Sequence, residues 1–251
     1  MIQKPSLITY ITAGDPNVDA TLEFLEILSK YSEIIELGIP FSDPMADGKT
    51  IEKSHYRALK AGTKVKDVFR VIEEFKDNHR TPIVLMTYYN PVFVRGLDNF
   101  IGTAKDSGVD AMLVVDLPIE EADDYLSVCE KYDMKTVFLA SPNTPNDRLK
   151  AIDEASSGFV YLISLYGTTG ARDRISSLAF DLVKRARGVC VKPLAVGFGV
   201  SKAEHVRELL KAGADGVVVG SAIVKLIEEF GEKAGDKIEE KCRELRKGLY
   251  Y

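Results

Sequence analysis

The segment at residues 193–227, PLAVGFGVSKAEHVRELLKAGADGVVVGSAIVKLI, contains the repeating unit that decides the fold. It begins with a short apolar stretch, Pro193–Val196, which is predicted to be a strand. A helical pattern follows, with Val206, Leu209 and Leu210 spaced to lie on one buried face. The unit is therefore predicted to be a strand followed by an amphipathic helix.

Residues at both ends of this helix mark its limits. Ser201 and Glu204 have the spacing of a capping box, and Gly213 is placed to end the helix. A second strand, Gly216–Val219, comes next. Strand, helix and strand in this order predict two parallel strands of one sheet.

The same alternation runs through the whole chain. Eight strands are predicted: Leu7–Ile11, Ile34–Leu37, Ile83–Thr87, Ala111–Val115, Thr136–Leu139, Phe159–Ile163, Pro193–Val196 and Gly216–Val219. Closing such a parallel sheet gives an α/β fold, a single-domain (β/α)8 TIM barrel over residues 1–251, for which ~250 residues is typical. An open doubly wound sheet is the alternative. It would usually carry a GxGxxG turn after the first strand, where this chain has Thr12-Ala13-Gly14-Asp15-Pro16.

Composition excludes several classes of protein. The net charge is -5 and no Lys/Arg cluster occurs, so a nucleic-acid partner is not expected. No apolar run approaches the length of a membrane span, and the N-terminus lacks a signal-peptide pattern. The cysteines, at 129, 190 and 242, and the histidines, at 55, 79 and 205, have neither disulfide nor zinc-ligand spacing. We expect a cytoplasmic enzyme without a metal.

Glu36 lies near the end of the predicted strand Ile34–Leu37. A carboxylate inside an apolar strand is unfavourable unless it is paired, protonated or used in chemistry. One interpretation is a structural ion pair with a Lys or Arg inside the barrel. The other is a general acid/base whose pKa is raised by burial, and a place at the C-terminal end of a barrel strand favours it.

Two polar loops follow predicted strands on this functional face, Gly38–Gly48 and Leu165–Asp173. Asp43 and Asp47 lie in the first, where Asp before Pro or Gly is also ordinary turn chemistry. Asp47 is close in sequence to Glu36. Two carboxylates in different surroundings allow one to donate a proton while the other stays charged, so this pair is predicted to be catalytic.

Glycines mark the ends of the last two strands. Gly197 and Gly199 follow the seventh strand, and Gly220 and Ser221 follow the eighth, with Ser221 expected to cap a short helix. In many barrels these two loops and the N-terminus of such a helix bind phosphate. The sequence therefore predicts a phosphorylated substrate.

Lysines are placed unfavourably for carbon–carbon cleavage through a Schiff base. Lys135 and Lys192 lie at the starts of their strands, which is the wrong end of the barrel. If a bond to carbon breaks here, carboxylates are expected to provide the acid/base catalysis.

Six motifs occur in order: Thr12-Ala13-Gly14-Asp15-Pro16, Glu36-Leu37-Gly38-Ile39-Pro40-Phe41-Ser42-Asp43-Pro44, Ala46-Asp47-Gly48, Met86-Thr87-Tyr88-Tyr89-Asn90-Pro91, Tyr166-Gly167-Thr168-Thr169-Gly170 and Gly197-Phe198-Gly199. Together they closely resemble the tryptophan synthase alpha chain over essentially the whole length. The resemblance implies retro-aldol cleavage of indole-3-glycerol phosphate to indole and glyceraldehyde 3-phosphate.

The resemblance also implies roles for particular residues. Glu36 would protonate the indole ring at C3, Asp47 would hold the indole N–H, and Thr169 would close over the site and touch Asp47. The phosphate would be bound by Gly170, Gly199, Gly220 and Ser221. The slot for the indole plane would be lined by Tyr10, Met86, Tyr161 and Phe198, for which barrel-core packing is the alternative interpretation.

A partner is implied in the same way. Members of this family work beside a tryptophan synthase beta chain, in an α2β2 heterotetramer, and only the beta chain would hold pyridoxal phosphate. The docking surface would be the rim with Gly38–Gly48 and Asp116-Leu117-Pro118, although Asp116 is also placed to cap a helix before Glu120 and Glu121.

Three features depart from the better-known bacterial pattern. The usual helix before the first strand is nearly absent, Lys49 replaces a common Pro, and Leu165-Tyr166 replaces an Arg-Ser or Arg-Ala pair. These changes concern loop closure and partner coupling. The alternatives to an alpha subunit are a self-sufficient indole-3-glycerol-phosphate lyase, a sugar-phosphate isomerase or epimerase, and a silent regulatory subunit.

Overall fold

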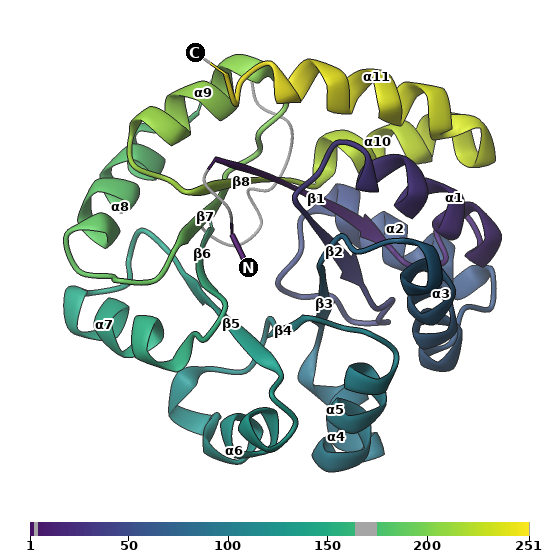
Figure 1. The fold of residues 1–251 in the computed structure, drawn as a ribbon, viewed down its shortest axis with the longest axis horizontal. Coiled ribbons are helices and arrows are strands. Elements are labelled where there is room, and N and C mark those ends of the chain that lie inside the picture. The colour runs from purple at the N-terminus through teal and green to yellow at the C-terminus, as the bar shows by residue number, and fades with distance from the viewer. Residues whose placement is uncertain (3–4, 164–174, 251) are drawn as a thin grey trace.

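The computed structural model describes residues 1–2, 5–163 and 175–250. Eight parallel strands close into a barrel in chain order, and β1 pairs with both β2 and β8 (Figure 1). The strands are β1 (Ser6–Thr12), β2 (Ile34–Gly38), β3 (Ile83–Thr87), β4 (Ala111–Val114), β5 (Lys135–Ala140), β6 (Phe159–Ile163), β7 (Leu194–Gly197) and β8 (Gly216–Val219). The predicted (β/α)8 barrel is confirmed, and the doubly wound alternative is wrong.

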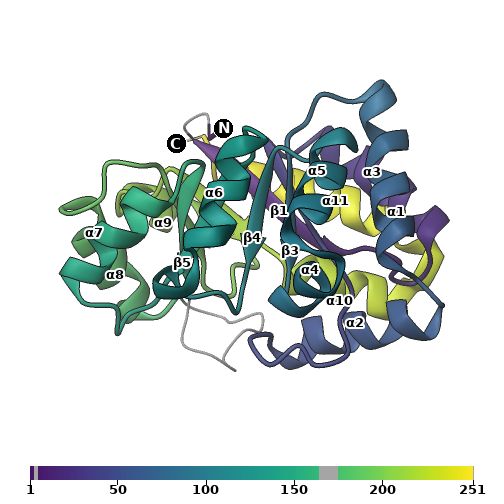
Figure 2. The same cartoon turned by 90° about the horizontal axis from the view of Figure 1, so that it is seen from below.

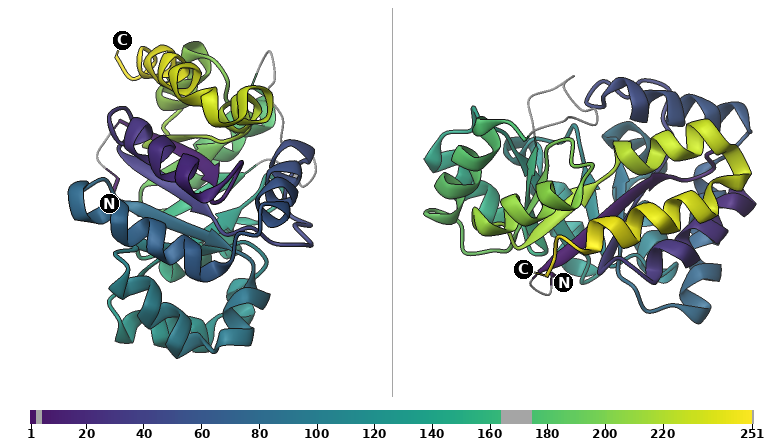
Figure 3. Two further views of the ribbon diagram at one scale, coloured as in Figure 1. Left: turned by 90° about the vertical axis from the view of Figure 1, so that its right-hand side faces the viewer. Right: turned by 90° about the horizontal axis from the view of Figure 1, so that it is seen from above.

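Helices form a ring around the barrel. They are α1 (Val18–Ser29), α3 (Val65–Asn78), α5 (Leu97–Asp106), α6 (Asp123–Lys131), α7 (Asn146–Ala155), α8 (Ser177–Arg187), α9 (Ala203–Lys211) and α11 (Gly235–Arg246). Figure 3 shows α11 lying along the outside beside α1. None of the helices in the described ranges is long and apolar enough to cross a membrane.

Further helices follow the C-terminal ends of strands: α2 (Lys49–Lys60), α4 (Tyr89–Arg95), the 3-10 turn η1 (Ile119–Glu121) and α10 (Ser221–Phe230), which continues into the 3-10 turn η2 (Gly231–Ala234). Figure 2 shows α2 and α10 at one end of the molecule and the two termini at the other. The helices α2 and α10 therefore stand at the end of the barrel where enzymes of this fold place their active sites.

The apolar core has two layers. One fills the space between strands and helices, and the other fills the inside of the barrel. Because side chains alternate along a strand, Ile8 and Tyr10 of β1 share the inner face with Ile34 and Glu36 of β2, with which they are in register. Apolar side chains thus fill the N-terminal part of the barrel, and Glu36 and Tyr10 lie above them.

The N-terminal end of the barrel is covered by residues before β1. Met1 and Ile2 pack against the inner cluster that includes Ile8 and Ile34. Two apolar side chains thus cover this end of the barrel.

Two predicted helix caps are wrong. The helix α9 begins at Ala203, and its N-cap is Lys202 rather than Ser201. Likewise Gly220, not Ser221, is the N-cap of α10, because the Gly220 carbonyl accepts the N–H groups of Ile223 and Val224. In both places the position before the helix has no side-chain cap hydrogen bond. The predicted end of α9 is correct, since Gly213 follows it with φ +113°.

Asp116 caps a different helix from the expected one. Tyr89 is the first residue of α4, and its N–H donates to Oδ1 of Asp116 at 2.7 Å. The N-cap of η1, which contains Glu120 and Glu121, is Pro118 instead. A contact across neighbouring strands, which the local sequence does not reveal, decides the role of Asp116.

Candidate active site

A pocket with a volume of about 540 Å³ opens at the C-terminal end of the barrel. Six strands contribute to its wall, together with the loops after β2, β7 and β8. The lining residues are Tyr10, Glu36, Asp47, Ile51, Met86, Tyr161, Gly197, Gly199, Val200, Val218, Gly220 and Ser221.

Glu36 is 1% exposed, and neither of its carboxyl oxygens has a hydrogen-bond partner among the described residues. Burial raises the pKa of Glu36 to about 8, because a charged carboxylate would lose its hydration there. The side chain is therefore a protonated acid at neutral pH, facing the pocket. The alternative interpretation, a structural ion pair inside the barrel, is wrong for the described part of the chain.

Asp47 has different surroundings. Its side chain is 8% exposed, its Oδ2 accepts the Tyr88 hydroxyl at 2.7 Å, and His55 Nε2 lies 3.4 Å from the same oxygen. Glu36, by contrast, has no such polar neighbour among the described residues. The structure thus brings together an acid that holds its proton and a carboxylate with hydrogen-bonding partners.

Asp43, in the same loop, lies outside the pocket. Its side chain is exposed and accepts the Ser42 hydroxyl at 2.5 Å, and its carbonyl accepts the Met45 N–H at 2.8 Å. These are contacts of a turn, so Asp43 is a turn residue.

Glycines make room for the two tyrosines of the pocket wall. A Cβ atom added to Gly38 would overlap the Tyr10 hydroxyl, and one added to Gly197 would lie 2.7 Å from the Tyr161 hydroxyl. With Met86, the two rings line the wall of the space beside Glu36. A flat aromatic substrate would find apolar surface here.

Phe198 does not join this wall. It is 4% exposed and packs in the layer between strands and helices. Phe198 follows the last residue of β7 and is not among the lining residues of the pocket. Its place in the indole slot stays a prediction.

The part of the wall that follows β7 and β8 consists largely of backbone. Gly199, with φ +71°, Gly220 and Ser221 line the pocket, and α10 begins at Ser221. The first N–H groups of a helix have no carbonyl partner within it and carry a partial positive charge, which suits an anion. Gly170 and Thr169 lie outside the described residues.

Two residues near Asp47 were missed from the sequence. Tyr88 continues the inward alternation of Val84 and Met86 on β3, and that periodicity could have revealed it. His55 is a single histidine on α2, and only the folded chain brings it against Asp47. Ile51 and Val218, which also line the pocket, have no signal beyond being apolar.

The fold and the pocket define a class of protein, a (β/α)8-barrel enzyme with two carboxyl groups and a helix N-terminus at the C-terminal rim of its strands. A profile of the tryptophan synthase alpha chain family matches residues 2–249. The chain is 62% identical to the tryptophan synthase alpha chain of Pyrococcus abyssi, covering 98% of this chain and 99% of that one. The chain belongs to the tryptophan synthase alpha chain family.

Other relatives agree. The tryptophan synthase alpha chain of Thermococcus kodakarensis is 59% identical over 98% of this chain and 97% of its own length. A solved structure of the tryptophan synthase α2β2 complex from Pyrococcus furiosus contains a chain that is 57% identical and superimposes with a TM-score of 0.95. That similarity covers 98% of this chain and 99% of the solved one.

Proposed function

We propose that this chain cleaves indole-3-glycerol phosphate to indole and glyceraldehyde 3-phosphate, as the alpha subunit of a tryptophan synthase. The observation that carries the proposal is the buried, protonated Glu36 in one pocket with the hydrogen-bonded Asp47. Membership of the family supports the choice of substrate. A sugar-phosphate isomerase would not need this pair beside an aromatic slot.

The reaction begins with proton transfer. Glu36 gives its proton to C3 of the indole ring, which makes that carbon a leaving group and puts positive charge on the ring. Asp47 accepts the indole N–H and stabilises this cation, as a fixed negative charge in a site of low dielectric should. The carbon–carbon bond then breaks as the substrate hydroxyl on the carbon that becomes the aldehyde loses its proton to the ionised Glu36, which restores the acid.

Binding is divided between two walls. Tyr10, Met86 and Tyr161 hold the indole plane. Gly199, Gly220 and Ser221 present backbone N–H groups to the phosphate. The family resemblance adds Gly170 to the phosphate site and Thr169 to the lid. Orientation of the substrate between two walls supplies part of the rate acceleration.

The chain works beside a beta chain in an α2β2 complex, and pyridoxal phosphate belongs to that partner. Exposed apolar side chains support docking at the rim of the pocket. Met45 in the loop after β2 is 87% exposed, and Phe93 and Val94 on α4 after β3 are 68% and 71% exposed. Apolar groups gathered at one end of a protein are typical of an interaction surface. The solved Pyrococcus furiosus complex supports the stoichiometry.

The cytoplasm is the proposed location. Cys129, Cys190 and Cys242 are buried and unpaired, which suits a reducing compartment.

The experiment is incubation of the purified chain with indole-3-glycerol phosphate, followed by an assay for free indole. Because the sequence contains no Trp, indole fluorescence is read against a low protein background. The assay is repeated after adding the matching beta chain. We expect slow release alone and faster release in the complex. Release without acceleration or co-elution would leave a self-sufficient lyase, and no release under either condition would remove the proposal.

A further inference from the structure

The two oxygens of Asp47 are unequal. Oδ2 accepts the Tyr88 hydroxyl at 2.7 Å and lies 3.4 Å from His55 Nε2, whereas Oδ1 has no hydrogen bond within the described part of the chain. Because Asp47 lines the pocket, one oxygen is held by Tyr88 and the other faces no partner among the described residues.

His55 is a buried side chain whose orientation is fixed. It is 2% exposed, and its Nδ1 accepts the N–H of Phe41 at 3.0 Å. A ring nitrogen that accepts a hydrogen bond carries no proton, so the other nitrogen, Nε2, is the donor. In the described part of the chain Nε2 has no hydrogen bond of good geometry, and Asp47 Oδ2 is the acceptor within reach. Such contacts often tighten when substrate binds.

Tyr88 holds the same oxygen from a second direction. Burial and the nearby Asp47 carboxylate raise the pKa of Tyr88, so the phenol stays protonated and donates to Asp47. Its oxygen in turn accepts the Ala46 N–H at 3.0 Å, and its ring stacks on Phe41 with centroids 4.9 Å apart. Both donors are therefore held by backbone N–H groups of the loop that carries Asp47.

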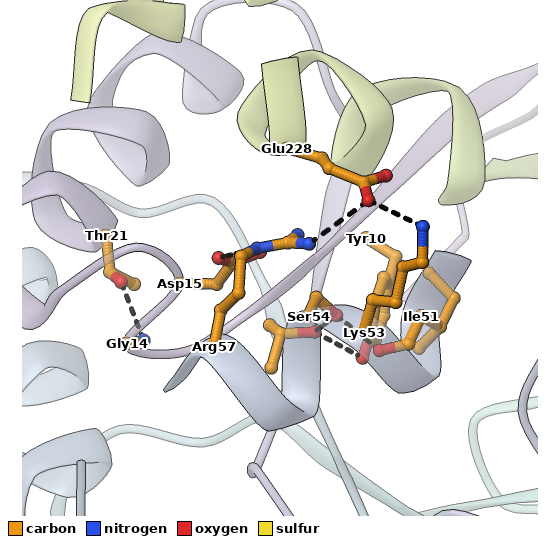
Figure 4. Close-up of polar contacts among 10 residues, drawn as sticks. Tyr10, Gly14, Asp15, Thr21, Ile51, Lys53, Ser54, Arg57 and Glu228 are labelled. Carbon is orange, nitrogen blue, oxygen red and sulfur yellow. Dashed lines mark hydrogen bonds and ion pairs between the residues drawn. The ribbon is translucent and has the colours of Figure 1, made fainter. Parts of the chain in front are cut away.

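The helix that carries His55 is itself tied down. Arg57 makes two hydrogen bonds of 2.7 Å to Asp15 in the loop after β1, and Lys53 pairs with Glu228 of α10 at 2.9 Å (Figure 4). Between these ion pairs the Ser54 hydroxyl lies 2.6 Å from that of Thr12 on β1. Lys53, Ser54 and Arg57, which flank His55 in the sequence, thus fix α2 to α10, to β1 and to the loop after β1.

We propose that His55 and Tyr88 are positioning residues that hold Oδ2 of Asp47 and aim Oδ1 at the N–H of the bound substrate. This inference rests on the proposed function for the identity of that N–H. The histidine and the phenol touch the carboxylate and not the reacting atoms, so they act through Asp47.

Double-mutant cycles test this dependence. His55→Leu removes both ring nitrogens, and Tyr88→Phe removes one hydroxyl. Each is expected to lower kcat for indole release about 10- to 100-fold, the range of a hydrogen bond to a charged group or of a misplaced catalytic group. In the Asp47→Asn background, each is expected to add less than about threefold, because the group it acts through has already lost its charge. If His55→Leu or Tyr88→Phe lowered kcat by as large a factor in the Asp47→Asn background as in the wild type, the proposal would be overturned.

Two further variants control for damage to the fold. His55→Gln keeps an N–H donor of similar reach and is expected to recover most of the activity that His55→Leu loses. His79→Leu is the matched control, because His79 stacks on Phe75 at 4.7 Å, away from the pocket. It should leave kcat and KM unchanged. If His55→Gln were no better than His55→Leu, a donor to Asp47 would not be what the site requires.

A measurement without turnover separates this proposal from the proposed function. In the 15N-histidine spectrum of the substrate-free chain, His55 is expected to be the Nε2–H tautomer, and its Nε2 signal should move in Asp47→Asn. A proton on Nδ1, or an Nε2 signal unaffected by Asp47→Asn, would overturn the positioning contact. Absence of indole release by the wild-type chain, with these signals present, would instead overturn the function while the contact stands.

Discussion

The β2 and β3 side of the pocket presents side chains to a ligand, whereas the β7 and β8 side presents backbone. On the first side Glu36 is buried without partners among the described residues, which raises its pKa, whereas Asp47 is hydrogen-bonded. On the second side Gly199, in the loop after β7, and Gly220, just before α10, have no side chain that would keep a ligand away from the backbone. The difference suggests that chemistry depends on side-chain environments on one side, and binding on backbone approach on the other.

The largest expected effect comes from the acid. Glu36→Gln keeps the shape of the side chain and removes the transferable proton. We expect kcat for indole release to fall by about 10²- to 10⁴-fold, the usual contribution of a general acid, with KM little changed. Steady-state kinetics and a separate measurement of substrate binding check this. Wild-type kcat in this variant would assign the proton transfer to another group.

The next effect comes from the charge on the partner carboxylate. Asp47→Asn should lower kcat by about 10²- to 10³-fold, because a fixed charge that stabilises a transition state contributes ~2.7–4 kcal/mol. Asp43→Asn is the matched control, since Asp43 lies in the same loop but is exposed and bonded to Ser42. Equal losses in the two variants would mean that loop shape, rather than charge in the pocket, is responsible.

The surroundings of Glu36 also make a prediction about stability. Its pKa is about 8 in the folded chain and near 4.5 when unfolded. Between these values the unfolded state is ionised while the folded state keeps its proton, so the free energy of unfolding falls as pH rises. The contribution of protonated Glu36 to the stability of the folded chain is fully present below about pH 4.5 and is lost above about pH 8.

Denaturant unfolding at several pH values measures this loss in the wild type and in Glu36→Gln. The wild type should lose stability relative to the variant between about pH 4.5 and pH 8, and the difference isolates Glu36 from the other titrating groups. Parallel curves for the two proteins would mean that Glu36 has an ordinary pKa.

Glu36 could be singled out from the sequence because its signal is local: a glutamate inside an apolar strand is conspicuous. The choice of Tyr10, Met86 and Tyr161 came from the family resemblance, and all three line the pocket. Phe198 was chosen in the same way, but it lies beyond the end of β7 and packs in the layer between strands and helices.

Contacts between distant segments could not be predicted. Asp116 accepts a hydrogen bond from α4 across neighbouring strands, and His55 reaches Asp47 from the helix after the loop that carries Asp47.

The predictions that Ser201 and Ser221 cap helices were wrong for another reason. Each serine has the right chemistry, but the helices begin at Ala203 and Ser221, so neither serine occupies the N-cap position.

The smallest expected effect tests the backbone side. A Cβ at Gly220 would lie 3.4 Å from the Tyr10 side chain, so a small group fits, but the branches of a valine must extend into the space beside the start of α10. Gly220→Val should therefore raise KM for indole-3-glycerol phosphate roughly tenfold, in line with losing a close contact to a helix N-terminus. The value of kcat should change little, because Glu36 and Asp47 belong to β2 and the loop after it rather than to the loop before α10. The comparison substrate is the same compound without its phosphate, for which KM should hardly change.

If both substrates lose affinity equally, Gly220 shapes the indole slot through Tyr10, and the phosphate lies elsewhere along the rim. If kcat falls instead of KM rising, the two sides of the pocket are coupled, and the division between chemistry and binding fails.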